Sequence, residues 1–169
     1  EERVSIREAI FTGRRLQNPL GALVKLDPLF IGVGQSQHDV NPRYLRECLH
    51  QTIEMCVSRI GVDVNTAPVE VLRYVSGIQM GTAQNIVAYR AEHGAFISRE
   101  QLREVAGIGE KTYEQCVGFL RIFGGGNPLD GTGIHPEFYA VVGRIAEDSG
   151  TTVEGLLGNR ALLREVDFS

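Results

Sequence analysis

The chain has 169 residues, of which 43% are hydrophobic and 22% charged, a composition typical of globular proteins. Its formal net charge at pH 7 is −4, and the acidic excess falls in residues 124–169, which hold three basic and seven acidic side chains. Residues 1–56 and 57–123 each balance seven basic against seven acidic side chains. This distribution excludes a strongly basic nucleic-acid-binding protein. No apolar run approaches the ~18 residues of a membrane span, so we expect no membrane partner.

Two helical segments are predicted at the start of the chain. Apolar residues at helical spacing predict a helix over residues 3–17, which Asn18-Pro19 interrupts, and a shorter helical stretch over residues 20–26. Residues 29–40 contain two glycines and no helical period, so we expect extended chain or loop there. Because the chain starts without Met inside a helical pattern, we expect it to be part of a longer protein.

A long helix is predicted next. Asn41 is a good N-cap and Pro42 suits the first helical position, so the helix should run to about Arg59, with Gly61 ending it.

The three cysteines, Cys48, Cys56 and Cys116, include no CxxC pair. Cys48 and Cys56 fall on the same predicted helix, about 12 Å apart along its axis, which is too far for a disulfide. The odd number of cysteines and this spacing favour free buried thiols in a reducing compartment. We therefore expect a cytoplasmic protein.

Residues 62–122 contain one helical unit twice. In the first copy the helix end Leu72–Val75 is followed by Ser76-Gly77-Ile78-Gln79 and a second helix. Thirty residues later, Leu102–Val105 is followed by Ala106-Gly107-Ile108-Gly109 and another helix. The sequence therefore predicts an all-α fold, in which a tandem of helical hairpins is flanked by further helical segments.

Capping patterns set the expected ends of these helices. Asn65 or Thr66 is the expected N-cap of the first unit, with Pro68 in its first turn, and Ser98 with Gln101 forms a capping box before the second. The glycine-rich residues 124–128 are expected to be a linker. The helical segments predicted after it open at His135-Pro136, at a capping box of Thr151 and Glu154, and at Arg160, the last covering residues 160–166.

The glycine turns form the candidate functional site. A helix N-terminus presents unpaired backbone N–H groups and partial positive charge, and a glycine turn before it lets a phosphate approach closely. In the second turn we expect Ile108 to anchor the turn by packing, Gly109 to adopt positive φ, and Lys111 to add a phosphate contact, with Gly107 completing the motif. Contacts of this kind touch only the backbone of a nucleic acid, so we expect binding without sequence preference.

The first turn matches the pattern less well. Gly77 and Ile78 repeat it, but Gln79 replaces the second glycine, so its Cβ obstructs the surface although its amide can donate a hydrogen bond. Glu110, beside the second turn, also disfavours phosphate binding. The other cations expected to be available to the two turns are Arg73, Arg90, Arg99, Arg103 and Arg121.

No catalytic, metal or cofactor site is predicted. Gly32-Val33-Gly34 lacks the strand, helix and third glycine of a nucleotide-binding loop. His38-Asp39 has no nucleophile or further metal ligand at a useful spacing, and the histidines at positions 50, 93 and 135 are scattered singly. We therefore expect that the chain is not an enzyme.

The order of these segments resembles a known family. VDVNTA, SGI, AQNIVAYR, GAFISREQL, GIGEKTYEQ and GFLRI follow one another as they do in tandem helix-hairpin-helix domains. The flanking segments RRLQNPLGALVKLDP, IGVGQSQHDV and GGGNPLDGTGIHPEFYAVVGRIA resemble those of the Tex family of bacterial transcription accessory proteins, so that the likeness covers about residues 4–166.

This resemblance implies a multidomain protein, similar to a eukaryotic elongation factor that binds histones and RNA polymerase. Residues 1–40 would follow an RNase H-like domain, residues 41–123 would form a leading helix and the tandem helix-hairpin-helix domain, and residues 124–169 would lead toward an OB-fold RNA-binding domain. We expect neither neighbouring domain in this chain, and the family's nucleic-acid binding is attributed largely to the OB-fold. Phosphate contact carries over fully to residues 107–109 and partly to residues 77–79.

Three functions stay open. The first is binding of a DNA or RNA backbone, which would be weak for this chain alone. The second is a scaffold that holds neighbouring domains and contacts RNA polymerase or other transcription proteins, which the balanced charge favours. The third is a DNA-uptake receptor of the competence type, which would need a membrane anchor. The sequence does not distinguish DNA from RNA or a duplex from a single strand.

Overall fold

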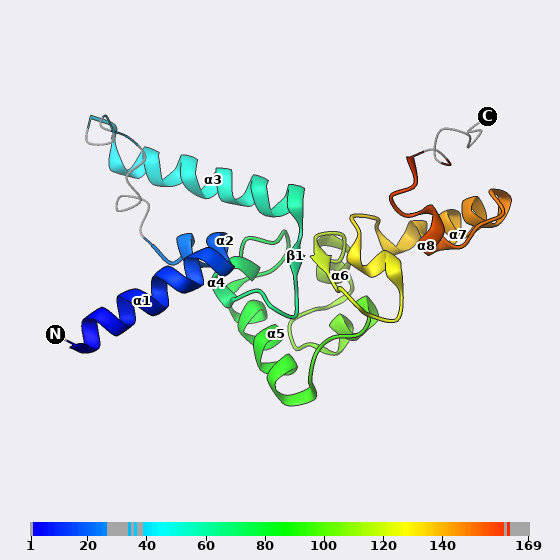
Figure 1. Cartoon of the computed structure of the whole chain (residues 1–169), viewed down its shortest axis with the longest axis horizontal. Coiled ribbons are helices and arrows are strands. Elements are labelled where there is room, and N and C mark those ends of the chain that lie inside the picture. Colours follow the sequence, from blue (N-terminus) through cyan, green and yellow to red (C-terminus); the bar gives the residue numbers. More distant parts are fainter. Residues whose placement is uncertain (1, 27–33, 35, 37–38, 161, 163–169) are drawn as a thin grey trace.

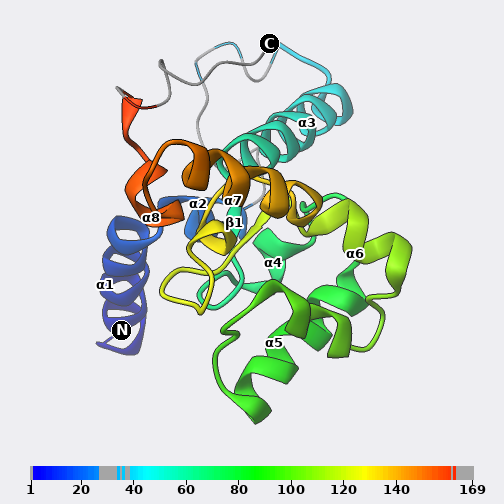
Figure 2. The same cartoon turned by 90° about the vertical axis from the view of Figure 1, so that its right-hand side faces the viewer.

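The computed structural model describes residues 2–26, 34, 36, 39–160 and 162, with the backbone alone for residues 2–4, 20 and 23. The described chain is all-α, as predicted, apart from one pair of two-residue strands. Figure 1 shows helices α1 and α3 extending from one side of a central body that contains α4, α5 and α6, with α7 and α8 at the other end. Figure 2 shows the same molecule with α7 and α8 facing the viewer.

The first two helices agree with the sequence pattern. Helix α1 (Glu2–Gln17) is followed by α2 (Pro19–Leu23), which ends earlier than predicted. Asn18 separates them, and its Oδ1 accepts a hydrogen bond of 2.9 Å from Gly21 N. Most of the loop predicted over residues 29–40, and most of the helix predicted over residues 160–166, lie outside the described residues.

Helix α3 (Pro42–Ile60) has both predicted ends. The Asn41 side chain accepts a hydrogen bond of 2.9 Å from Arg43 N, and Gly61 ends the helix at φ 80°. Val57 is the one residue of this helix that is fully buried. Most of the surface of α3 therefore faces away from the core.

The first hairpin begins differently from the prediction. Helix α4 (Val69–Leu72) has Pro68 at its N-cap position, so neither Asn65 nor Thr66 caps it. Asn65 instead pairs with the backbone of Phe96, since its Nδ2 donates to Phe96 O at 2.9 Å and its Oδ1 accepts from Phe96 N at 2.8 Å. Asn65, expected to cap a helix, therefore links two segments that are 31 residues apart in the chain. A local sequence pattern does not reveal a contact of this kind.

The remaining helices of the two hairpins follow the repeat. The first hairpin closes with α5 (Met80–His93). The second opens with the 3₁₀ helix η3 (Arg99–Glu104), whose predicted capping box of Ser98 and Gln101 is present, and closes with α6 (Glu110–Cys116).

A short strand pairing, which the sequence does not signal, joins the outer ends of the two hairpins. Strands β1 (Val62–Asp63) and β2 (Leu120–Arg121) are parallel. Val62 N donates to Phe119 O at 2.8 Å and Val64 N donates to Arg121 O at 3.0 Å. The start of the first hairpin is thus fixed to the end of the second.

The core repeats with the sequence. Residues thirty positions apart in the two hairpins are buried in one cluster, to which burial of apolar surface contributes the main stabilisation. The matching pairs are Leu72 and Leu102, Val75 and Val105, Ile78 and Ile108, Ala83 and Tyr113, and Ile86 and Cys116.

Only one of the three thiols is fully buried. Burial raises the pKa of Cys116 to about 12, which keeps this thiol protonated. Cys48 and Cys56 are half-buried, so the expectation of buried thiols holds for Cys116 alone.

The C-terminal segment packs back onto the second hairpin. Its elements are the 3₁₀ helices η4 (Pro128–Gly131) and η5 (Pro136–Phe138) and the helices α7 (Tyr139–Asp148) and α8 (Val153–Leu156). The predicted linker over residues 124–128 is a packed turn, because Gly126 N donates to Ile97 O at 2.9 Å. The N-cap of α8 is Thr152 rather than the predicted Thr151.

Arg99 holds this segment in place, although the sequence presents it as a free cation. Only 1% of Arg99 is exposed. Its guanidinium donates at 2.6–3.0 Å to the carbonyl oxygens of Leu120, Thr132 and Ile134 and to the hydroxyl of Tyr139.

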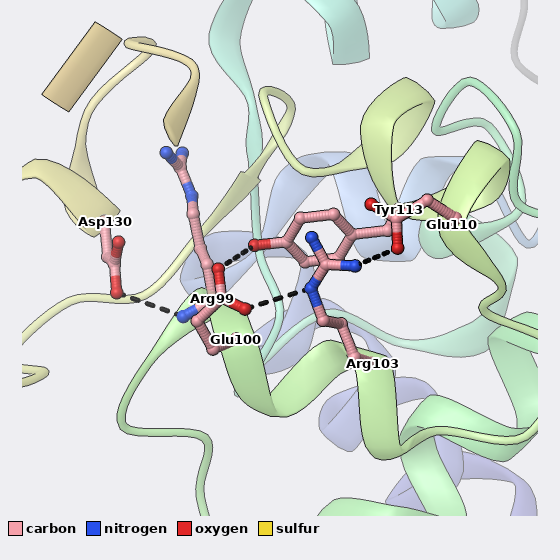
Figure 3. A network of polar contacts seen from close by, with 6 residues as sticks. All are labelled: Arg99, Glu100, Arg103, Glu110, Tyr113 and Asp130. Carbon is pink, nitrogen blue, oxygen red and sulfur yellow. Dashed lines mark hydrogen bonds and ion pairs between the residues drawn. The ribbon is translucent and has the colours of Figure 1, made fainter. Parts of the chain in front are cut away.

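Asp130 completes this network. It accepts from Arg99 N at 3.0 Å (Figure 3) and from the Tyr139 hydroxyl at 2.7 Å. Burial, followed by the bond to Asp130, raises the pKa of Tyr139 to about 12. The network therefore joins η3, β2, η4 and α7 through groups whose hydrogen bonds are satisfied.

Arg99→Met should destabilise the fold, because it keeps an apolar stem but leaves the three carbonyl groups without donors. Each unsatisfied buried polar group costs about 1–3 kcal/mol, so the free energy of unfolding should fall by about 3 kcal/mol or more. Arg144→Met, on an exposed position of α7, is the control and should change it by less than about 0.5 kcal/mol. Urea unfolding followed by circular dichroism measures both, and equal effects would contradict the assigned role.

Candidate nucleic-acid interface

The two glycine turns have the same backbone. Gly77 and Gly107 have φ of 80° and 93°. In each turn the isoleucine that follows donates its backbone N–H to the valine two residues before the glycine, Ile78 to Val75 and Ile108 to Val105, both at 3.0 Å. Ile78 and Ile108 are 5% and 6% exposed, so Ile108 anchors its turn as predicted and Ile78 does the same.

The predicted positive φ at Gly109 is wrong. Gly109 is the N-cap of α6 with φ −84° and ψ 177°, and Gln79 is the N-cap of α5 with φ −90° and ψ 168°. These are extended conformations that any residue adopts. The glycine that the turn requires is therefore the first of each motif, and the substitution of glycine by Gln79 leaves the backbone unchanged.

Each turn packs against the second helix of the other hairpin. A Cβ built on Gly77 would lie 3.0 Å from the Cβ of Gln115 in α6, and one built on Gly107 would lie 3.0 Å from the hydroxyl of Thr82 in α5. Asn85 of α5 also donates from Nδ2 to Ala106 O at 2.7 Å. The two turns are thus held side by side by reciprocal contacts.

Beyond these contacts, the start of each second helix is open. Gln79 and Gly109 are exposed. The Gln79 side chain accepts no hydrogen bond from α5, and Gly109 has no side chain that could cap α6. A Cβ on Gly109, or on Gly81 in the first turn of α5, would meet no atom within 4 Å. Uncapped N–H groups at two adjacent helix starts provide backbone donors and partial positive charge for an anion.

The surroundings of the two helix starts differ in charge. The first turn of α5 holds no acidic residue, whereas α6 begins with Glu110. Lys111 is exposed and forms no ion pair or hydrogen bond with any described residue. The glycine pattern favours the second turn as the phosphate site. In the structure, however, the first turn precedes the longer helix, α5, and has no acidic residue at the helix start.

Most of the arginines predicted to be available to the turns are bound internally. Arg99 lies in the network described above, Arg90 donates to Val64 O at 2.6 Å and Arg121 donates to Gly118 O at 2.6 Å. Burial lowers the pKa of both Arg90 and Arg121. Arg73 lies 5.0 Å from the ring centre of Tyr74. The sequence shows that these cations exist but not that backbone carbonyl groups bind them.

Arg103 is bound by side chains instead. Figure 3 shows its guanidinium between Glu100 and Glu110, with hydrogen bonds to both carboxylates. It also lies 3.7 Å from the centre of the Tyr113 ring, whose hydroxyl donates to Glu100 at 2.8 Å. The bond to Glu110 raises the pKa of Arg103, and burial raises the pKa of Tyr113.

A third glycine turn, which the sequence analysis missed, connects α7 and α8, but its hydrogen bond, from Thr151 N to Ala146 O at 2.9 Å, differs from those of the first two turns. Gly150 has φ 65°, and Thr152, two residues later, is the N-cap with φ −90° and ψ 165°. Its hydroxyl accepts from Gly155 N at 3.2 Å, so this helix start is capped. Three exposed acidic residues flank the turn, namely Glu147, Asp148 and Glu154. A glycine two residues before a threonine was the available signal.

The other titratable candidates form no site. Within the described residues, no group of three or more His, Cys, Asp and Glu side chains is placed to hold a metal ion. His50 and His93 are hydrogen-bonded to Tyr74 and Tyr89, and His135 is hydrogen-bonded to Glu114 and accepts from Glu137 N as the N-cap of η5. Gly32-Val33 and His38 lie outside the described residues. None of the described helices combines the length and apolar character that crossing a bilayer requires.

Comparison with known proteins agrees with this geometry. A family model described as a helix-hairpin-helix motif matches residues 57–121, and one described as an HHH domain matches residues 127–169. Over 98% of its length the chain is 51% identical to the transcriptional accessory protein Tex of Neisseria gonorrhoeae. The chain belongs to the Tex family. It is also 49% identical, over 98% of its length, to protein YhgF of Escherichia coli.

The chain spans about a fifth of these Tex-family relatives, 22% of each. A human relative, S1 RNA-binding domain-containing protein 1, is 45% identical over 118 residues, which are 70% of this chain and 12% of that protein. Neither matching family description names an enzyme. The predicted family and its helix-hairpin-helix motifs are therefore confirmed.

The two glycines of the second turn should differ in their effect on stability. Gly107→Ala places a side chain at positive φ and close to Thr82, so the free energy of unfolding should fall by about 1 kcal/mol or more. Gly109 has negative φ and open space at its Cβ position, so Gly109→Ala should change the free energy of unfolding by less than about 0.5 kcal/mol. Thermal and urea unfolding compare the two variants, and an equal loss in both would contradict the assigned roles.

Proposed function

We propose that this chain is a sequence-independent nucleic-acid-binding module of a transcription accessory protein. It contacts phosphates with the backbone amides of its paired turns, residues 77–79 and 107–109, aided by Lys111. The observation that carries this proposal is the pair of uncapped helix starts, held side by side after identical turns, in a region that matches a helix-hairpin-helix motif.

The roles within each turn divide between packing and contact. The first glycine and the buried isoleucine shape the turn, while the N-cap residue and the amides after it face the ligand. Gln79 adds an amide donor at the first turn, and the second turn has Gly109 followed by Lys111. Donors of this kind bind phosphate oxygens and do not contact the edges of the bases, which supports binding without sequence preference.

Binding by this chain alone should be weak. Each cation that contacts a phosphate contributes to the salt-dependent part of the affinity. Three of the five arginines near the turns are bound to backbone carbonyl groups, so they do not contribute to it. We infer that residues 41–123 form the binding module, that residues 124–169 connect it to a neighbouring domain, and that the intact protein supplies further affinity in the cytoplasm.

A scaffold is the second candidate function. The network around Arg99 fixes the C-terminal segment to the hairpins, which suits a module that holds other domains in a defined arrangement. In that case the contacts with RNA polymerase or other transcription proteins would use the surfaces of the helices, and the turns would only pack. Both candidate functions are non-enzymatic.

A titration of fluorescent nucleic acid tests the proposal. The probes are short duplex DNA, single-stranded DNA and single-stranded RNA, each at about 50 mM and 200 mM salt because phosphate contacts are salt-sensitive. Gly81→Ala/Gly109→Ala adds methyl groups only at the open helix starts, so its Kd should rise about fivefold or more. Lys111→Ala should weaken binding and reduce the slope of log K against log salt by about 1.

Gly143→Ala in α7 is the matched control, because a Cβ there also meets no atom within 4 Å. It should leave the Kd unchanged. No binding of any probe at the lower salt, or binding that the double variant retains in full, would favour the scaffold.

A further inference from the structure

The cluster around Arg103 adds a charged group to the edge of the second turn. Arg103 Nε lies 2.9 Å from Glu100, and Nη1 bonds to Glu110, the residue directly after Gly109. Two carboxylates face one guanidinium, so the cluster carries a net charge of about −1 at pH 7. The side chain of Arg103 is 39% exposed, and those of Glu100 and Glu110 are 69% and 66% exposed.

Arg103 differs from the other arginines of the hairpins in what binds it. Arg90, Arg99 and Arg121 donate to backbone carbonyl oxygens of the core, which cannot move away. Both partners of Arg103 are exposed side chains. Glu100 is also held by the Tyr113 hydroxyl at 2.8 Å, whereas Glu110 can rotate into water. An ion pair between exposed side chains contributes only about 0–1 kcal/mol, so a competing anion can replace it.

The position of the guanidinium does not depend on the carboxylates alone. It lies over the ring of Tyr113, 3.7 Å from the centre, and Tyr113 itself is 3% exposed. This cation–π contact with a buried ring holds the guanidinium at the edge of the turn when a carboxylate leaves. Its planar set of donors fits two phosphate oxygens as well as it fits two carboxylate oxygens.

We propose that Arg103 is a phosphate-binding residue of the second turn, and that Glu110 occupies it in the free protein until a nucleic-acid phosphate replaces that carboxylate. This inference rests on the proposed function, since it assigns a specific side chain to the same interface. Glu110 then acts as an internal competitor that lowers the affinity of the second turn, and Glu100 and Tyr113 keep Arg103 in position during the exchange.

A double-mutant cycle on Arg103 and Glu110 tests this exchange. Glu110→Gln is compared with Glu114→Gln, which removes the same charge from an exposed position of α6 one turn away. Any general gain from lost negative charge is common to both variants. Affinity for duplex DNA and single-stranded RNA is measured at about 50 mM and 200 mM salt.

We expect Glu110→Gln to lower the Kd at least fivefold more than Glu114→Gln does, with the slope of log K against log salt larger by about 1. This excess should disappear in the Arg103→Met background. Met keeps an apolar stem over Tyr113, and unchanged thermal unfolding would show that this variant is folded. Arg103→Lys should recover only part of the excess, because it keeps the charge but loses the planar donors.

Two results are distinguishable in this experiment. Equal affinities of Glu110→Gln and Glu114→Gln, in a wild-type chain that binds and loses affinity with Gly81→Ala/Gly109→Ala, would overturn the exchange and leave the proposed function standing. Absence of binding by the wild-type chain and by Glu110→Gln alike would overturn both.

Discussion

The reciprocal packing of the two glycine turns is the constraint on which the rest of the module depends. Gly77 lies against Gln115 of α6 and Gly107 lies against Thr82 of α5. The turn of each hairpin therefore packs against the second helix of the other hairpin. A side chain at either glycine would need positive φ and would press on the facing helix. This packing fixes the distance between the two helix starts. Under the proposed function, a nucleic-acid backbone with regularly spaced phosphates would contact both helix starts.

The same structure explains why few of the arginines in the described hairpins are free. Three of the arginines in the hairpins stabilise the fold, and Arg99 alone binds the carbonyl groups of Leu120 in β2 and of Thr132 and Ile134 after η4. A guanidinium suits this use because it stays charged and has five donors in one plane. As a result, few cations are free beside the two turns, so the proposed phosphate contacts would depend on backbone amides, Lys111 and Arg103.

How much could be predicted from the sequence depends on how local each feature is. The helices α1 and α3, the cap at Asn41, the capping box at Ser98 and the thirty-residue repeat are set by neighbouring residues, and their prediction is confirmed. Asn65 and Arg99 were misjudged because their partners lie at least 21 residues away in the chain. The conformation of Gly109 was misjudged because a Gly-x-Gly motif does not show which glycine the turn requires.

The central claim is that backbone amides at two adjacent helix starts contact nucleic acid. Amide spectra of the ¹⁵N-labelled chain, recorded at about 50 mM salt while short duplex DNA or single-stranded RNA is added, test it most directly. The account predicts the largest shifts at residues 79–82 and 109–112, with the capped third turn at residues 150–153 unaffected. Shifts concentrated on α1, α3 or the third turn, with both helix starts unaffected, would contradict it.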